Sequence, residues 1–158
     1  MNYNFKNHVA VVTGASRGIG KEIAKGFSNA GCSVALISRN LKELENVKAI
    51  IKNNSNKIEC FSCDISNFDD VQSTFEKIQK SLGKISFLIN NAGLTKDNLL
   101  LRMNENDWDI VLDVNLKGCF NTIKAVTKPM LRSKSGRIIN ITSVIGLIGN
   151  AGQTNYAA

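Results

Sequence analysis

The sequence contains no run of about 18 consecutive apolar residues, the length that a membrane-spanning helix requires. Residues 1–6 also lack the long apolar stretch of a secretory signal peptide. The net charge is +7, but no Lys/Arg run reaches about five residues and no nucleic-acid-binding motif occurs. These absences predict a cytoplasmic protein with neither a membrane nor a nucleic acid among its partners.

Cysteine is sparse, and its spacing argues against a metal or redox centre. The four thiols are Cys32, Cys60, Cys63 and Cys119. Cys60 and Cys63 have C-x-x-C spacing, but no second such pair accompanies them and they fall in an expected strand. We therefore expect four reduced, mostly buried thiols and no bound metal.

The composition is that of an ordinary globular protein, with 43% apolar and 21% charged residues, and 158 residues are enough for one domain with a core. Short apolar runs alternate with helical patterns. Strands are expected at residues 8–13, 33–37, 58–62, 85–89 and 137–141. Helices are expected at residues 18–30, 41–53, 67–82 and 105–130, with loops at 53–56 and 143–154.

This alternation predicts βαβ units, right-handed crossovers and a parallel sheet covered on both faces. No linker, repeat or low-complexity segment interrupts it. We expect a single Rossmann-type, doubly wound α/β domain over residues 1–158, with five strands present and the remaining strands missing. Three helices have a spacing that predicts core-facing residues: Ile19, Ile23, Ala24 and Phe27; Leu41, Leu44, Val47 (or Lys48) and Ile51; and Val71, Phe75 and Ile78.

Three glycines lie between the first expected strand and the first expected helix. Gly14, Gly18 and Gly20 form a G-x-x-x-G-x-G pattern, which is neither G-x-G-x-x-G nor a P-loop. Glycine lets the backbone approach a phosphate closely, and the free N–H groups and dipole of a helix N-terminus favour negative charge. The pattern predicts a phosphate-binding turn; a tight strand-to-helix turn without a ligand is the alternative.

Several ordered motifs resemble those of the short-chain dehydrogenase/reductase family. Thr13-Gly14-Ala15-Ser16-Arg17-Gly18-Ile19-Gly20 is similar to its cofactor turn, and Asn90-Asn91-Ala92-Gly93 to its second signature. Asn115, Ser143 and Tyr156 follow in the order and spacing of its catalytic residues. The resemblance covers residues 7–158. Segments 93–103 and 143–156 resemble the 3-oxoacyl-acyl-carrier-protein reductase branch of bacterial-type fatty acid synthesis, although acetoacetyl-CoA reductases and other ketoreductases share much of them.

The resemblance implies NADPH-dependent reduction of a 3-oxoacyl thioester to its 3-hydroxyacyl form. Tyr156 would protonate the carbonyl oxygen, and Ser143 would donate a hydrogen bond to it. Asn115 would hold a water that resupplies protons; an asparagine on an apolar helix needs a polar partner if it is buried. Taken singly, these residues have simpler alternatives: a turn residue, a rim aromatic and a solvated amide.

The choice of cofactor follows from charge. The second expected strand ends in Ile37-Ser38-Arg39-Asn40, without the acid that would accept the ribose hydroxyls of NAD. Arg17 and Arg39 are placed to meet the 2′-phosphate of NADP, which suits a guanidinium, so we expect NADP(H); Arg39 as a solvated strand-end residue is the alternative. By resemblance, Asp64 and Ile65 would flank the adenine, and the expected cofactor-binding residues together are Gly14, Ser16, Arg17, Gly18, Ile19, Gly20, Arg39, Asp64, Ile65, Asn91, Ala92 and Gly93.

The sequence departs from the family pattern at its end. The family motif is Tyr-x-x-x-Lys, and the lysine would be position 160, whereas the sequence stops at Ala158. In the family this lysine holds the nicotinamide ribose and supplies a cation beside the tyrosine. We expect the chain to be the N-terminal part of a longer enzyme, with the 158-residue polypeptide alone inactive or nearly so. The fifth expected strand would then be an exposed apolar edge.

Partners are inferred from a cluster of cations near the end of the fourth expected helix: Lys128, Arg132, Lys134 and Arg137. Acyl carrier protein is acidic, so this cluster is a candidate dock, with Arg132 and Lys134 foremost; cations complementing the helix dipole are the alternative. The resemblance implies a homotetramer at full length. Two other functions remain open: a short-chain reductase of a sugar, steroid or small ketone, and a non-catalytic dinucleotide-binding module.

Overall fold

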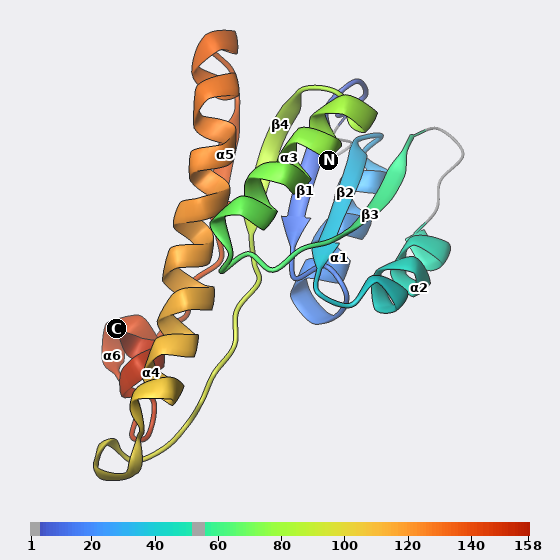
Figure 1. Cartoon of the computed structure of the whole chain (residues 1–158). Coiled ribbons are helices and arrows are strands. Elements are labelled where there is room, and N and C mark those ends of the chain that lie inside the picture. Colours follow the sequence, from blue (N-terminus) through green and yellow to red (C-terminus); the bar gives the residue numbers. More distant parts are fainter. Residues whose placement is uncertain (1–3, 52–55) are drawn as a thin grey trace.

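The described chain forms one parallel sheet with the strand order β3-β2-β1-β4-β5 (Figure 1). The computed structural model describes residues 4–51 and 56–158. The predicted Rossmann-type α/β fold is confirmed, because β1 lies between β2 and β4, where such sheets change their direction of winding. The strands are β1 Val9–Thr13, β2 Ser33–Ser38, β3 Ile58–Ser62, β4 Ile85–Asn90 and β5 Arg137–Asn140.

Alternate side chains of β1 belong to two separate hydrophobic clusters, one on each face of the sheet. Val9 and Val11 pack with residues of α3 (Phe68–Leu82) and α5 (Gly118–Ser133). Ala10 and Val12 pack with residues of α1 (Gly18–Asn29) and α2 (Leu41–Ile51). Because helices cover both faces, all five residues of β1 are buried, and its end is held firmly at the centre of the sheet.

The predicted helix faces are mostly correct. The predicted residues of α3 are all buried, as are Leu44, Val47 and Ile51 of α2 and Ala24 of α1. Ile23 and Phe27 are partly buried. Ile19 and Leu41 were expected to face the core and do not: Ile19 is 64% exposed and Leu41 is also exposed. Both lie in the first turn of their helices, ahead of the part that packs on the sheet.

The long helix expected at residues 105–130 runs on to Ser133 and contains an irregular turn. It consists of α4 (Glu105–Leu112), a π-helical turn η2 (Asp113–Lys117) and α5. Asn104 caps its start, accepting a hydrogen bond from Asp107 N–H at 2.8 Å. A single π-helical turn spans too few residues to leave an apolar period of its own, and the sequence pattern therefore gave no sign of it.

The chain after β5 contains two short helices, α6 (Ile145–Ile148) and α7 (Thr154–Ala157), which lie beside α4 at the end marked C in Figure 1. The prediction of a loop over 143–154 is therefore wrong at residues 145–148 and at residue 154, where α7 begins. Ser143 Oγ accepts a hydrogen bond from Ile145 N–H at 3.2 Å, which supports the start of α6. A further single turn, η1, spans Leu100–Arg102.

Strand β5 is the edge of the sheet, and all four of its residues are exposed. The predicted apolar edge is thus confirmed. The expectation that helices cover both faces of the sheet holds for the central strands but not for β5. Within the described residues, no helix combines the length and the hydropathy needed to span a bilayer. Residues 52 and 53 of the second predicted helix, and 53–55 of the loop after it, lie outside the described residues.

Candidate active site

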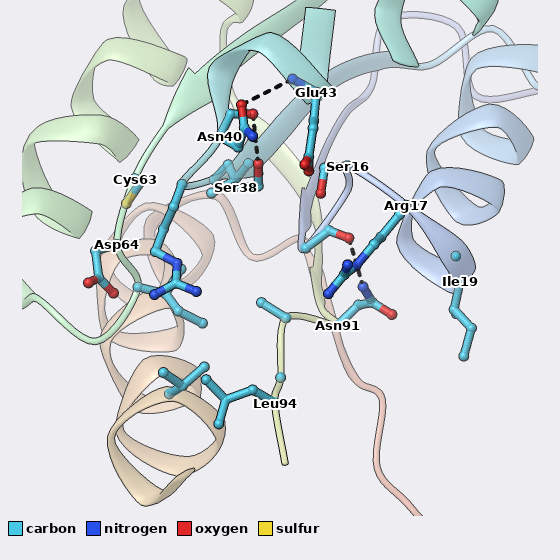
Figure 2. A pocket seen from close by; sticks show the side chains of 18 residues that line it. Ser16, Arg17, Ile19, Ser38, Asn40, Glu43, Cys63, Asp64, Asn91 and Leu94 are labelled. Atoms are coloured by element: carbon cyan, nitrogen blue, oxygen red, sulfur yellow. Dashed lines mark hydrogen bonds between the residues drawn. The ribbon is translucent and has the colours of Figure 1, made fainter. Parts of the chain in front are cut away.

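A cavity of about 630 Å³ opens at the edge of the sheet where β1, β2, β3 and β4 end (Figure 2). Ligands of open α/β sheets bind at this edge, beside the point where the strand order reverses. Eleven of the twelve predicted cofactor residues line it, and the twelfth, Gly20, lies behind the turn. Its lining comprises Gly14, Ser16, Arg17, Gly18, Ile19, Ile37, Ser38, Arg39, Asn40, Glu43, Cys63, Asp64, Ile65, Asn91, Ala92, Gly93, Leu94 and Val114.

The glycine turn between β1 and α1 depends on missing side chains. Gly14 (φ 63°) and Gly18 (φ 53°) adopt left-handed conformations that favour glycine. A Cβ on Gly14 would lie 2.8 Å from Ala92 Cα, and one on Gly20 would lie against the Gly14 carbonyl and 2.5 Å from Asn91 Nδ2. A Cβ on Gly18 would meet nothing within 4 Å, so at Gly18 the backbone faces open space.

The start of α1 is suited to an anion. Its N-cap residue is Arg17, whose side chain makes no capping hydrogen bond, and the first turn contains no acidic residue. The first N–H groups of the helix consequently keep their positive potential toward the cavity. This arrangement fits a phosphate group.

Hydrogen bonds from the end of β4 hold the turn in place. Thr13 Oγ1 accepts the N–H groups of Asn91 and Ala92, both at 3.0 Å. Asn91 Nδ2 donates to the carbonyls of Thr13 and Gly14 at 3.0 and 3.3 Å. Asn91 therefore supports the glycine turn from the neighbouring strand, which the sequence pattern alone did not reveal.

Arg17 and Arg39 both line the cavity, Arg17 as the N-cap residue of α1 and Arg39 as the residue that follows β2. Neither guanidinium takes part in an ion pair among the described residues, where the two salt bridges are Lys48–Glu45 and Lys117–Asp113. Two unpaired guanidinium groups on one cavity favour a ligand with more than one anionic group. Glu43, an acid in the first turn of α2, also lines the cavity.

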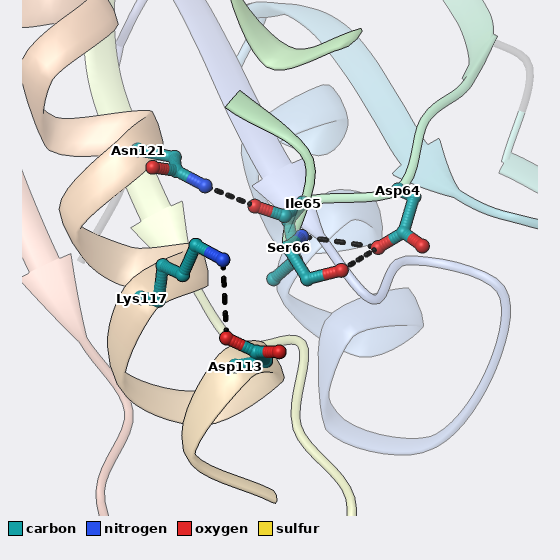
Figure 3. A network of polar contacts seen from close by, with 6 residues as sticks. All are labelled: Asp64, Ile65, Ser66, Asp113, Lys117 and Asn121. Carbon is teal, nitrogen blue, oxygen red and sulfur yellow. Dashed lines mark hydrogen bonds and ion pairs between the residues drawn. The ribbon is translucent and has the colours of Figure 1, made fainter. Parts of the chain in front are cut away.

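The loop after β3 is fixed by its own polar contacts and by α5 (Figure 3). Asp64 Oδ1 accepts hydrogen bonds from Ser66 N–H at 3.0 Å and Ser66 Oγ at 2.7 Å. Asn121 Nδ2 donates to the Ile65 carbonyl at 2.8 Å. A Cβ on Gly118 would lie 2.7 Å from Ile65 Cδ1, so α5 packs closely on this loop. The cavity wall formed by Asp64 and Ile65 is therefore well supported.

The three predicted catalytic residues do not line the cavity, and only Asn115 adjoins it, as the residue after the lining residue Val114. Asn115 is in the π-turn, and its amide pairs with the Leu94 main chain: Oδ1 accepts from N–H at 2.9 Å and Nδ2 donates to the carbonyl at 3.0 Å. Asn115 is partly buried, and its polar partner is Leu94, itself a cavity residue. Ser143 precedes α6, and Tyr156, which is partly buried, lies on α7.

The thiols form no pair. Cys60 packs with the cluster under α1 and α2, whereas Cys63 packs with the cluster under α3 and α5, so the two lie on opposite faces of the sheet. All four cysteines are free; Cys32 and Cys63 are buried and the other two are partly buried. Desolvation raises the pKa of Cys32 and Cys60 to about 12 and that of Cys63 to about 11. Among the described residues no cluster of metal-ligating side chains occurs.

Sequence reasoning missed seven of the cavity residues: Ile37, Ser38, Asn40, Glu43, Cys63, Leu94 and Val114. Most lie within two residues of a predicted site residue, at the end of a strand or just beyond it. The rule that parallel strands present their carboxyl ends at one edge could have found them. Glu43 and Val114 could not be found this way, because they reach the cavity from α2 and from the long helix.

The comparisons with known proteins agree with this geometry. The family model described as short chain dehydrogenase matches residues 8–158. A 3-oxoacyl-acyl-carrier-protein reductase of Staphylococcus epidermidis is 44% identical over 155 residues, covering 96% of this chain and 63% of the relative. One of Staphylococcus aureus is 45% identical over 150 residues, covering 94% and 61%. Nodulation protein G of a Rhizobium species is 44% identical over 149 residues, covering 94% and 60%.

A solved structure shows the same fold. The crystal structure of a putative short-chain alcohol dehydrogenase from Sinorhizobium meliloti superposes with a TM-score of 0.95 at 29% identity, covering all of this chain and 63% of the other. The chain belongs to the short-chain dehydrogenase family. The chain spans just under two thirds of the length of the curated relatives it matches.

Proposed function

We propose that the protein of this sequence reduces a 3-oxoacyl thioester, carried on acyl carrier protein, to the 3-hydroxyacyl form with NADPH, as in fatty acid synthesis. The similarity to 3-oxoacyl-acyl-carrier-protein reductases over nearly the whole chain supports the reaction. The observation that carries the cofactor choice is the pair of unpaired guanidinium groups, Arg17 and Arg39, on one cavity.

The cavity residues fit a dinucleotide. The glycine turn leaves no room for side chains at Gly14 and Gly20, and the uncapped start of α1 faces the same space. In this proposal, the first N–H groups of α1 bind the pyrophosphate, and Arg17 and Arg39 bind the 2′-phosphate. Asp64 and Ile65 flank the adenine, while Asn91, Ala92 and Gly93 line the ribose and nicotinamide side. When bound, the nicotinamide supplies the hydride.

The catalytic residues of the chain then handle the proton and the developing charge. Tyr156 gives the proton of its phenol to the carbonyl oxygen as negative charge builds there. Ser143 Oγ accepts a hydrogen bond from Ile145 N–H, which leaves the hydroxyl hydrogen to donate to the same oxygen. The side chain of Asn115 holds Leu94 beside the cavity; its role in holding a proton-supplying water stays a prediction.

A cofactor titration tests the part of the proposal that concerns the choice of NADPH over NADH. NADPH and NADH are titrated into the protein and followed by nicotinamide fluorescence. We expect NADPH to bind at least about tenfold more tightly, because it adds contacts between a phosphate and two guanidinium groups. The variant Arg39→Ala should weaken NADPH binding and leave NADH binding nearly unchanged. Equal loss for both cofactors would count against the 2′-phosphate role.

A turnover assay of the full-length protein with NADPH and a 3-oxoacyl thioester tests the reaction. A sugar, a steroid and a small ketone are assayed as alternative substrates, because the similarity to a short-chain alcohol dehydrogenase leaves another ketoreductase activity as the second candidate function. Tight NADPH binding without turnover of any carbonyl would instead favour a non-catalytic binding module.

The basic cluster near the end of α5 is the proposed dock for acyl carrier protein. Lys128, Arg132, Lys134 and Arg137 are all exposed, and Lys134 ends the helix in a left-handed conformation (φ 49°). Arg132→Glu with Lys134→Glu should raise KM about tenfold or more for a carrier-bound substrate and little for a small thioester. The same reversal at Lys42 and Lys48 on α2 provides the matched control. Equal effects on both substrates would contradict docking.

We also propose a homotetramer for the full-length protein. Leu116, Phe120 and Leu131 are exposed apolar side chains on η2 and α5, which supports a protein contact on that helix. Sedimentation velocity on the full-length protein tests this assembly, and a monomer at micromolar concentration would contradict it.

A further inference from the structure

Asn155, the residue before Tyr156, is the buried residue of α7. α7 has four residues, too few for a helix that is stable alone, so its position depends on its tertiary contacts. Asn155 is 1% exposed, while its neighbours Tyr156 and Ala157 are partly buried. A polar side chain therefore anchors the helix that carries the proposed proton donor.

The amide of Asn155 joins α7 to two other segments. Nδ2 donates to the Lys96 carbonyl at 3.0 Å and to the Asp107 carbonyl at 2.9 Å. Since both partners are acceptors, only the donor end of the amide can face them. Oδ1 is buried and has no partner among the described residues. Asn155 thus acts through its two N–H groups, one toward the loop after β4 and one toward α4.

The same loop also holds the other side of the site. Leu94, two residues before Lys96, pairs with the amide of Asn115 and lines the cavity. Asn98 N–H donates to the Gly152 carbonyl at 2.8 Å, just before α7. The loop at residues 94–98 therefore contacts both the cavity and the segment of Tyr156, and Asn155 makes the buried part of that connection.

We propose that Asn155 is a positioning residue, which fixes the Tyr156 phenol relative to the loop at 94–98 and hence to the cavity. This inference rests on the proposed function, in which Tyr156 is the proton donor. Proton transfer requires donor and acceptor within hydrogen-bond reach, and a displacement of about 1 Å lowers such rates about 100-fold.

The first test is Asn155→Asp in the full-length protein. This variant keeps the shape of the side chain but replaces the donor by an oxygen that faces two carbonyl oxygens. We expect kcat for the 3-oxoacyl thioester to fall about 100-fold while the Kd of NADPH changes less than about twofold. An unchanged kcat, or loss of NADPH binding in parallel with kcat, would overturn a positioning role.

Asn104→Asp is the matched control, because the same chemical change there should have no such effect. Asn104 caps α4 through its acceptor, Oδ1, and aspartate provides the same acceptor. We expect kcat within about twofold of the unmutated chain. If this control lost as much activity as Asn155→Asp, the loss would reflect added charge near the site, and the inference would fail.

Hydrogen exchange of residues 153–158 gives a readout that needs no turnover. Asn155→Asp should speed exchange in this segment about tenfold or more, and Asn104→Asp should not. Unchanged exchange in Asn155→Asp would overturn the inference, whether or not the unmutated protein reduces a substrate. Absence of turnover in the unmutated protein would count against the proposed function alone. If Asn155→Asp does not fold, Asn155→Ser keeps one donor without charge and should show the same changes at about tenfold in kcat.

Discussion

At the scale of single residues, the turn between β1 and α1 shows how tightly the backbone packs around the proposed phosphate site. Gly20 lies under Gly14 and beside Asn91 Nδ2, which itself holds the carbonyls of Thr13 and Gly14. A methyl group at this point would have to move backbone atoms, because the Gly14 carbonyl is not a flexible side chain. Stability and ligand binding are therefore coupled at Gly20.

Replacing Gly20 by alanine should destabilise the protein by about 1–3 kcal/mol, the usual cost of overpacking, and weaken NADPH binding about tenfold or more. Urea unfolding and a fluorescence titration measure the two effects. Gly26→Ala provides the control on the same helix, since a Cβ there meets nothing within 4 Å. It should stabilise the protein by up to about 1 kcal/mol. Similar losses at both positions would contradict the proposed crowding.

At the scale of secondary-structure elements, the long helix connects both halves of the cavity. Asn115 holds Leu94 after β4, Asn121 holds Ile65 after β3, and Thr122 contacts Asn90 at the end of β4. Asn115 lies in η2 and the other two residues lie in α5, so one continuous helix contacts the ends of both strands. Asn90 in turn donates to Asn140 Oδ1 at 2.9 Å and ties in β5.

The contact between Thr122 and Asn90 can be tested with a near-isosteric change. Thr122 Oγ1 donates to Asn90 Oδ1 at 2.7 Å, and Asn90 is 3% exposed. Thr122→Val leaves this buried oxygen without its donor and should cost about 1–3 kcal/mol of unfolding free energy. Thr127→Val removes a hydroxyl that bonds to Ile123 on the exposed face of α5 and should change stability by less than about 0.5 kcal/mol. Equal values in urea unfolding would refute the prediction.

The sequence predicted elements well where a local pattern defines them and poorly where distant contacts do. The buried strands β1 and β2 were predicted to within a residue, because continuous apolar runs are bounded by glycine or polar residues. Helix α6 was missed, since Gly146 interrupts a very short apolar run. The roles of Asn91 and Asn155 depend on partners 78 and 59 residues away, and no spacing in the sequence reveals such pairings.

At the scale of the whole molecule, the inner strands of the sheet differ from the edge strand β5. β1, β2 and β4 are covered by helices, whereas β5 exposes Ile138 and Ile139 together with its outer backbone groups. An open apolar edge favours pairing with another strand. We therefore expect this 158-residue chain to self-associate.

The variant Ile139→Lys should reduce this self-association in sedimentation velocity at micromolar concentration, because a lysine on an edge strand opposes pairing. Ile139 is 44% exposed, so the change should cost little stability. Ile50→Lys adds the same charge at a 63% exposed position on α2, away from the edge, and should leave the association unchanged. A monomeric unmutated chain would contradict the expectation.

Stability should also fall at alkaline pH. Burial raises the pKa of Cys32 and Cys60 to about 12, from 9.0 for an unperturbed thiol. The folded state then binds these protons more tightly than the unfolded state, so their contribution is complete below pH 9 and decreases as the pH rises toward 12. The urea midpoint should drop between pH 8.5 and about 10.5, and less steeply in Cys32→Ala. An identical slope in that variant would show that other groups cause the loss.

The hydrogen bonds between Thr13 and Asn91 have a consequence for synthesis on the ribosome. Thr13 emerges 78 residues before the asparagine that supports it. At about 5–20 residues per second, roughly 4–16 seconds pass between the synthesis of Thr13 and that of Asn91, which follows β4. A nascent chain therefore lacks the supported form of the proposed phosphate-binding turn until β4 and Asn91 have left the exit tunnel, late in the translation of this stretch.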